Sequence, residues 1–383
     1  MKDLIALEKE YSLWEYKLFD YPLWIHCREP LINIGIFAER KIKRPKIISM
    51  LKSFMKTIKF LVTQYKYDKV FFLMERAELL EIYYKNKSSK KILFLNLEQE
   101  RVYKGENYIS SDFFSLLRFL SRKVAFIVFR KKYEEMVLHL SKIGYANQLD
   151  KYIKIAMGDA LFLKFLSLVL SKKSQKLYTG AVIPMGEKFV NALNSYEIQH
   201  GVIYPTHIGY MDIPHVRNNL ILYSKRYETM MRNHGYNGKL IVDNYKKTFF
   251  EKESKRHLPI VIYTQPVLDM QEGINEFIKE KQPTNLFIQK HPKDYFAYEI
   301  SDDYFVTATT PLEVEYPIIY SSSIIENFIL YGKKCYIYDI KYPDANLRDF
   351  LTIYTEDIES NILIMGSLNV IYEEIQSEIA CLK

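Results

Sequence analysis

The sequence contains little cysteine: three residues in a chain of 383, at positions 27, 335 and 381. Cysteines this far apart form neither a disulfide framework nor the spacing of metal ligands, which favours a reducing compartment. The first ten residues lack the apolar run and the small-residue cleavage site of a secretory signal. We therefore expect a cytoplasmic protein.

Long hydrophobic runs are also missing. The most apolar segment, residues 155–170, is shorter than the ~20 residues that span a bilayer, and it carries two charged residues. This segment predicts a buried helix instead. The chain as a whole is 48% hydrophobic over 383 residues, which is more than one core usually organises, so we expect two domains.

Several nucleotide and catalytic fingerprints are absent as well. The sequence has no Gly-x-x-x-x-Gly-Lys-Ser/Thr loop, no Gly-x-Gly-x-x-Gly turn and no Gly-x-Ser-x-Gly elbow, which argues against ATPases, dehydrogenases and serine hydrolases of the usual types. His200 and His207 are seven residues apart across Pro205 and have no third ligand at a zinc-type spacing. The acidic pair Asp302-Asp303 falls in an expected surface turn. We predict neither a metal site nor a cofactor.

Positive charge is abundant, because the formal net charge is +8 at pH 7. Residues 40–59 hold eight basic residues and no acidic one, and apolar residues from Ile48 to Val62 recur at helical spacing, which predicts a basic amphipathic helix. A solvated helix face explains this pattern as well as contact with an anionic membrane does. Nucleic acid is not expected, because no zinc-finger, basic-zipper or RNA-binding signature accompanies the charge.

Apolar runs alternate with helical patterns along the first half of the chain, which indicates a parallel α/β domain. The first forty residues are rich in aromatic side chains and predict a helical cap with a turn at Pro22. The expected strands are 69–74, 91–96, 124–129, 196–199, 220–223 and 239–242. The expected helices are 77–85, 113–120 and, with an interruption at Gly144, 133–174.

The second half repeats the alternation after a strongly charged segment, 244–257, which is typical of a linker. We therefore expect two α/β domains, at 1–247 and at 258–383. The strands expected in the second domain are 259–263, 285–289, 304–307, 318–320 and 334–338, and the helices are 271–281 and 324–331.

Histidines cluster in the middle of the chain, where six of the eight lie between positions 200 and 291. Clustered titratable groups suggest a site. His200 is the strongest candidate, because it stands beside Gly201 at an expected strand end, where open α/β sheets place their ligands. His215, His234 and His257 are better explained as surface or core residues.

A second candidate region combines serines with a Lys-His-Pro sequence. Ser321-Ser322-Ser323 stands at an expected strand-to-helix turn, where hydroxyl and backbone N–H groups bind anions. The alternative is structural, because Ser323 and Glu326 match a capping box that binds nothing. Lys290-His291-Pro292 follows another strand. If the two strands are adjacent and parallel, both loops leave the same sheet edge and grip one phosphate from two sides.

The order of these motifs resembles one known group of enzymes. Gln199-His200-Gly201, Lys290-His291-Pro292 and Tyr320-Ser321-Ser322-Ser323 with Glu326 are similar to the series in bacterial GT-B glycosyltransferases of surface polysaccharides. That group includes CMP-sugar-dependent sialyltransferases and Kdo transferases. The CDP-glycerol polymerases of teichoic acid synthesis carry a related series. The motifs cover about the last half of the chain.

The resemblance implies an α/β fold of GT-B type, with two Rossmann-like domains facing across a cleft. It implies that the N-terminal domain, 1–247, binds the acceptor and that the C-terminal domain, 258–383, binds a nucleotide-sugar donor, CMP-sugar favoured. It implies catalytic roles for His291 at the leaving phosphate and for His200 at the acceptor, with Glu326 at the ribose. The implied substrate-binding residues are Gln199, Gly201, His207, Lys290, Ser321, Ser322, Ser323 and Glu326.

No divalent metal is implied, because protein groups stabilise the departing nucleotide. The acceptor would be a cell-surface polysaccharide or a lipid-linked glycan, handled by a peripheral protein at the inner face of the cytoplasmic membrane. Two other classes stay open beside a CDP-polyol phosphotransferase. One is a sugar-nucleotide epimerase on the same fold, and the other is a non-catalytic nucleotide-binding protein.

Overall fold

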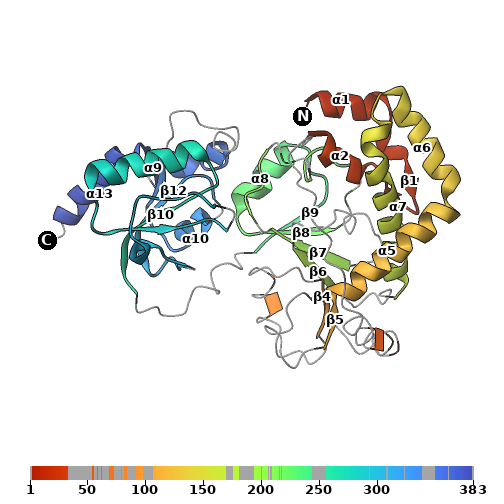
Figure 1. The fold of residues 1–383 in the computed structure, drawn as a ribbon, viewed down its shortest axis with the longest axis horizontal. Helices are drawn as coiled ribbons and strands as arrows, with labels where there is room; N and C mark the ends of the chain where they lie inside the picture. Colours follow the sequence, from red (N-terminus) through yellow and green to blue (C-terminus); the bar gives the residue numbers. More distant parts are fainter. Residues whose placement is uncertain are drawn as a thin grey trace. The chain divides into compact units, whose positions relative to one another are not determined.

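A computed structural model describes most of the chain and divides it into two compact units (Figure 1). The described ranges are 2–32, 69–72, 92–97, 107–169, 176–180, 194–243, 256–338 and 350–381, without positions 200, 206, 208, 215, 217, 293, 308, 323 and 361, and with positions 54, 55, 58, 62, 79, 82 and 83. The first unit is Met1–His200, Thr206–Leu222 and Met231–Asp243. The second is Gly201–Pro205, Tyr223–Met230 and Asn244–Lys383.

The first unit is built on a seven-stranded parallel sheet with the order β5-β4-β3-β6-β7-β8-β9. The order reverses between β3 and β6, which is the pattern of a doubly wound α/β sheet. Its strands are β3 (Lys69–Phe72), β4 (Ile92–Leu97), β5 (Asn107–Ser110), β6 (Lys176–Gly180), β7 (Asn194–Ile198), β8 (Asn219–Leu222) and β9 (Lys239–Val242).

The described part of the first unit also contains helices. They are α1 (Lys2–Glu10), α2 (Ile25–Ile32), α5 (Ser111–Val128), α6 (Arg130–Lys142), α7 (Ala146–Val169) and α8 (Lys225–Asn233), whose first residues are assigned to the second unit. A short hairpin joins β1 (Lys17–Leu18) to β2 (Tyr21–Pro22), and the 3-10 helix η1 (Leu13–Glu15) precedes it. Pro22 therefore lies in a hairpin strand of the aromatic N-terminal cap.

Helix α7 is the buried helix that the apolar run 155–170 predicts. It packs against α2, α5 and α6 (Figure 1). Gly158 lies at its crossing with α5, because a Cβ atom there would stand 2.7 Å from the Cα of Arg122. Gly144 separates α6 from α7 with a positive φ of 80°, as expected for a helix C-terminus. None of the helices in the described part of the chain combines the length and apolar composition needed to cross a membrane.

The second unit contains a five-stranded parallel sheet with the order β11-β10-β12-β13-β14. Its elements are β10 (Leu258–Tyr263), α9 (Leu268–Lys281), β11 (Leu286–Gln289), η5 (Asp302–Tyr304), β12 (Val314–Ile319), α10 (Ile325–Leu330), β13 (Cys335–Tyr338), α12 (Thr355–Glu359), β14 (Leu363–Gly366) and α13 (Leu368–Cys381). Strand β13 is wholly buried, as parallel strands covered on both faces are. Helices α9 and α13 pack together, with the rings of Phe277 and Tyr372 5.3 Å apart (Figure 1).

Two strand predictions are wrong. Residues 124–129 lie at the end of α5 and the turn after it, because the apolar run there continues a helical face and does not alternate as a strand does. Residues 304–307 do not form a strand. They begin in η5 and pair with β11 only through a bridge between Phe305 and Ile288.

The predicted basic helix at 40–59 lies outside the described residues except for Phe54, Met55 and Ile58, which are helical and exposed. Most of the predicted linker at 244–257 also lies outside them, as do His200 and Ser323.

Candidate functional site

The candidate site lies at the carboxyl edge of the sheet in the second unit. The strand order reverses between β10 and β12, and open α/β sheets bind ligands outside the carboxyl ends of the strands at such a point. Tyr263 at the end of β10 is in register with Gln289 of β11 and with Ile319 of β12. The loops that contain Lys290-His291 and Ser321-Ser322 therefore leave the same edge.

These two loops do not follow adjacent strands, which corrects the sequence-based expectation. Strand β10 lies between β11 and β12, so the two strand ends are about 10 Å apart at the usual spacing of ~4.8 Å per strand. The loop after β10, which begins at Thr264, therefore stands between them. A ligand that contacts both His291 and the serines must also pass this third loop.

Thr264 is a residue that the sequence analysis missed. It is buried, its Oγ1 donates a hydrogen bond to Asp294, and the same oxygen accepts one of 3.3 Å from the backbone N–H of His291. Asp294 also accepts from the hydroxyl of Tyr298 at 2.7 Å and from the backbone N–H of Phe296 at 3.0 Å. Thr264 and Asp294 thus fix the loop that carries the Lys-His-Pro sequence.

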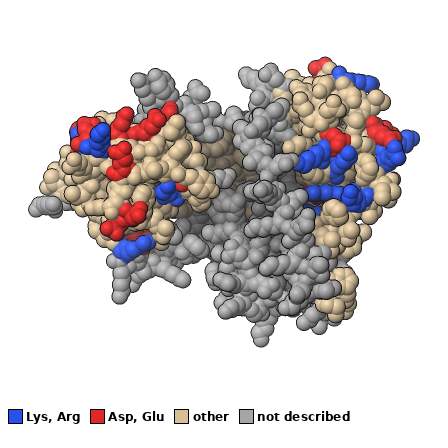
Figure 2. Space-filling model, in the orientation of Figure 1, with Lys and Arg blue, Asp and Glu red and all other residues tan. Residues whose placement is uncertain are grey.

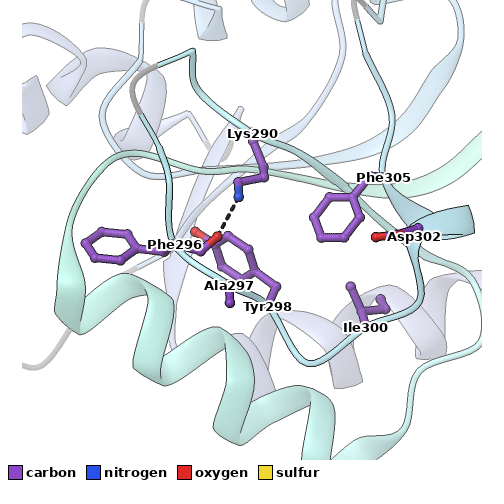
Figure 3. A pocket seen from close by; sticks show the side chains of 7 residues that line it. All are labelled: Lys290, Phe296, Ala297, Tyr298, Ile300, Asp302 and Phe305. Carbon is purple, nitrogen blue, oxygen red and sulfur yellow. Dashed lines mark hydrogen bonds between the residues drawn. The ribbon is translucent and has the colours of Figure 1, made fainter.

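Lys290 lines a pocket of about 520 Å³ beside this loop (Figure 3). Its ammonium donates a hydrogen bond to the carbonyl oxygen of Phe296 and lies 5.4 Å and 5.9 Å from the ring centroids of Tyr298 and Phe305. The remaining lining residues are Ala297, Ile300 and Asp302. The pocket is thus lined by aromatic rings, one ammonium group and one carboxylate, which together suit a ligand with a polar ring.

His291 is half-buried and directly follows Lys290. Its backbone is fixed on both sides, since its N–H donates to Thr264 and its carbonyl oxygen accepts from the N–H of Asp294 at 2.8 Å. These two hydrogen bonds hold the backbone of the loop at His291.

Ser321 and Ser322 are half-buried at the end of β12. The Ser322 Oγ accepts a hydrogen bond of 3.4 Å from the N–H of Ile324, and its carbonyl oxygen accepts one of 3.2 Å from Ile325. Helix α10 begins at Ile325 with Ile324 as its N-cap, one residue later than the capping-box alternative requires. Ser322 thus closes the turn that leads into α10.

Glu326 lies in the interior of the second unit. Its carboxylate is 1% exposed, accepts a hydrogen bond of 2.8 Å from the hydroxyl of Tyr354, and lies 3.6 Å from the Nε of Arg226. Arg226 also pairs with Asp357, and its guanidinium stacks over the ring of Tyr354 at 4.8 Å. Burial works to lower the pKa of Arg226, but the charges of Glu326 and Asp357 outweigh burial and raise it. The contact of Glu326 with a ribose stays a prediction.

A chain of tyrosine hydroxyls connects this cluster to the Gln-His-Gly segment. Tyr354 and Tyr227 share a hydrogen bond of 2.9 Å, Tyr223 donates to Tyr227 at 3.5 Å, and Tyr223 also lies 2.9 Å from the carbonyl oxygen of Gly201. Burial raises the pKa of Tyr227 and of Tyr354, so both hydroxyls keep their protons. No described atom lies within 4 Å of a Cβ built on Gly201, so this backbone faces open space.

The other candidates of this segment belong to the first unit. Gln199 is buried, and its backbone N–H donates to Ile221 at 2.9 Å. Glu197 is buried and accepts hydrogen bonds from Tyr210 at 2.6 Å and from Asn218 at 2.7 Å, so it holds the core of that unit. His207 is exposed, and its Nδ1 accepts from the N–H of Gly209 at 3.1 Å.

The structure thus brings Lys290, His291, Ser321 and Ser322 to one sheet edge and ties Gly201 to the interior of the same unit. Among the described residues, no group of three or more His, Cys, Asp or Glu side chains is placed to hold a metal ion. No protein-family model matches the sequence, and no curated protein matches it significantly.

Proposed function

We propose that this protein is a glycosyltransferase of GT-B architecture. It moves a sugar from a nucleotide donor, with CMP-sugar favoured, to a surface polysaccharide or lipid-linked acceptor. The observation that carries the proposal is the reversal of strand order at β10 and β12, with Thr264, His291, Ser321 and Ser322 along the same carboxyl edge. The motif series of the sequence supports the same class.

In this proposal the donor phosphate lies over the sheet edge. His291 and the two serines donate hydrogen bonds to its oxygens, and the ring-lined pocket at Lys290 takes the base. A cytosine ring suits that pocket, because a carboxylate such as Asp302 accepts from its amino group, whereas uracil presents a carbonyl oxygen there. This pairing supports the preference for a cytidine nucleotide.

The reaction then needs no group beyond the protein and its two substrates. The acceptor oxygen attacks the anomeric carbon and the bond from that carbon to the phosphate oxygen breaks. The electron pair of that bond stays on the phosphate, and the acceptor proton passes to His200. Hydrogen-bond donors already directed at the phosphate stabilise the negative charge that develops on it. Such stabilisation is the largest single contribution to the rate enhancement of many enzymes.

A thermal-shift panel of CMP, UMP, CDP, UDP and GDP in excess EDTA tests this proposal. A ligand that binds the folded state adds about 2.7 kcal/mol to stability at 100 times its Kd. We expect CMP to raise the melting temperature more than UMP does, and both binding and transfer to persist in EDTA. Activity that chelation abolishes and Mg²⁺ or Mn²⁺ restores would contradict the GT-B assignment.

Replacing His291 by alanine is expected to weaken CMP binding by about tenfold to a hundredfold, because a hydrogen bond to a charged group contributes roughly 1.5–3 kcal/mol. The fold should persist, since Thr264 holds the backbone of this loop. His257→Ala is a matched control, because that exposed histidine of the same unit pairs with Glu315 at 3.3 Å, away from the sheet edge. Calorimetric titration of both variants with CMP is the measurement. Equal affinity would place the phosphate elsewhere.

The alternatives separate by their products. A CDP-polyol phosphotransferase releases CMP while it transfers a phosphate with the polyol, so the phosphorus enters the polymer. An epimerase converts the donor without any acceptor. A non-catalytic protein binds the nucleotide in calorimetry and turns nothing over.

A further inference from the structure

Helix α5 of the first unit presents an apolar face to solvent. Its exposed hydrophobic side chains follow helical spacing, with exposed fractions of 54% for Phe119, 47% for Leu120, 48% for Val124, 74% for Ile127 and 63% for Val128. We call these five residues the α5 apolar face. Lys123 is the one charged residue exposed between Phe119 and Val128, and its ammonium lies 5.7 Å from the Phe119 ring.

The opposite side of α5 is the one that packs on the protein. Ala125 is fully buried, Arg118 lies over the ring of Phe162 at 5.3 Å, and Arg122 reaches Asp159 of α7 at 3.6 Å. Helix α7 therefore covers the side of α5 that carries Arg118 and Arg122, and it leaves the α5 apolar face exposed. A contiguous exposed apolar surface of this kind marks an interaction site.

Basic residues outnumber acidic ones beside this face. Residues 113–133 contain six basic residues and no acidic one, and Arg130, Lys131 and Lys132 in the first turn of α6 are all exposed. Glu134 pairs with Arg130 at 2.8 Å, and Glu135 follows it. Figure 2 shows blue side chains, with some red ones among them, beside tan surface in the region that Figure 1 labels α5 and α6. A partner that offers both an apolar medium and negative charge therefore complements this surface.

We propose that the α5 apolar face docks on an anionic lipid bilayer. Helices of this kind lie in the plane of the interface, with apolar side chains ~5–10 Å deep and Lys and Arg at the headgroups. Lys123 reaches the headgroups by extending its stem along the apolar surface. A second copy of this chain fits less well, since a symmetric contact through α5 would bring the two basic clusters together.

Cosedimentation with vesicles tests this proposal. The full chain should pellet with phosphatidylcholine vesicles that contain phosphatidylglycerol, bind weakly to pure phosphatidylcholine, and be released by high salt because such attraction is screened. Each basic residue near an anionic surface contributes about 1 kcal/mol, or about fivefold, so Lys131→Gln with Lys132→Gln should lower partitioning about 25-fold. Lys279→Gln, at an exposed lysine of α9, is the matched control and should bind as wild type does.

The apolar contribution needs a variant of its own. Ile127→Glu with Val128→Glu should abolish most binding, while Val370→Glu, at a residue of α13 that is 57% exposed, should not. Circular dichroism confirms that each variant is folded. Wild-type pelleting by the Ile127→Glu, Val128→Glu variant would overturn the proposal. So would a dimer of the free protein, seen by analytical ultracentrifugation, that this variant abolishes while vesicles bind neither protein.

Discussion

Replacing His200 by alanine is expected to lower turnover at least ~10²-fold and to leave donor affinity nearly unchanged. A neutral imidazole suits the proton transfer, because its unperturbed pKa of ~6.5 lets it accept a proton near pH 7. The two neighbouring residues are held, Gln199 by its hydrogen bond to Ile221 and Gly201 by the one that it accepts from Tyr223. Removing the imidazole should therefore leave the path of the chain intact.

His207→Ala is the matched comparison, since His207 is an exposed histidine of the same segment and its Nδ1 accepts a hydrogen bond from Gly209 in its own turn. Initial rates at saturating donor, with calorimetric affinities for CMP, should show a much smaller loss for this variant. A His200→Ala protein that keeps its melting temperature but no longer binds nucleotide would move His200 to the donor site. The proposed division between donor and acceptor histidines would then be wrong.

The sequence predicted those strands whose apolar runs are continuous and bounded. Strands β10 and β13 are such cases, because parallel strands buried on both faces leave an uninterrupted hydrophobic signal. Strand β11 was also predicted, from the apolar run Leu286–Ile288, although its burial alternates. Strand β6 was missed, since Lys176–Gly180 contains only two large apolar residues. Strand β12 was recognised only from Ile318 onward, because Pro317 interrupts a run that begins at Val314.

The motifs of the candidate site could be predicted from the sequence, but the order of the strands that carry them could not. The sequence places Lys290-His291 and Ser321-Ser322 at strand ends, yet nothing in it says that β10 separates the two strands. Thr264 and Asp294 carry no motif, and they become significant only through the hydrogen bond between them. The GT-B arrangement of the two units stays a prediction.

The chain of tyrosine hydroxyls could not be predicted from the sequence either. The protein has 32 tyrosines, so composition alone distinguishes none of them. Tyr223, Tyr227 and Tyr354 are joined by contacts across as many as 127 positions in sequence. A buried polar network of this kind is visible only once the fold brings its members together.

The same network predicts a large loss of stability when Glu326 is replaced. Glu326→Ala should lower the free energy of unfolding of the second unit by about 3 kcal/mol, because breaking a buried ion pair leaves its partner uncompensated. Arg226 would keep Asp357, which holds the loss at the lower end of the range for such changes. Tyr354→Phe should cost about 1.5 kcal/mol, since it removes hydrogen bonds to Glu326 and Tyr227 but no charge.

Urea unfolding can assign this loss to the correct unit. Both tryptophans, Trp14 and Trp24, lie in the first unit, so their fluorescence follows that unit, whereas far-ultraviolet circular dichroism follows both. Glu326→Ala should shift the dichroism transition to lower urea and leave the fluorescence transition in place. Glu272→Ala, at an exposed carboxylate of α9, should change neither by more than about 0.5 kcal/mol.

The same variant also separates the two roles open to Glu326. If the carboxylate holds the ribose of the donor, Glu326→Ala lowers affinity for CMP much more than affinity for a nucleotide that lacks the contacted hydroxyl, and unfolding is unchanged. If it holds the network, stability falls, and Tyr354→Phe lowers it in the same unit by a smaller amount. The burial of Glu326 and its hydrogen bond to Tyr354 favour the second outcome. Wild-type unfolding of both variants would show that this cluster does not stabilise the fold.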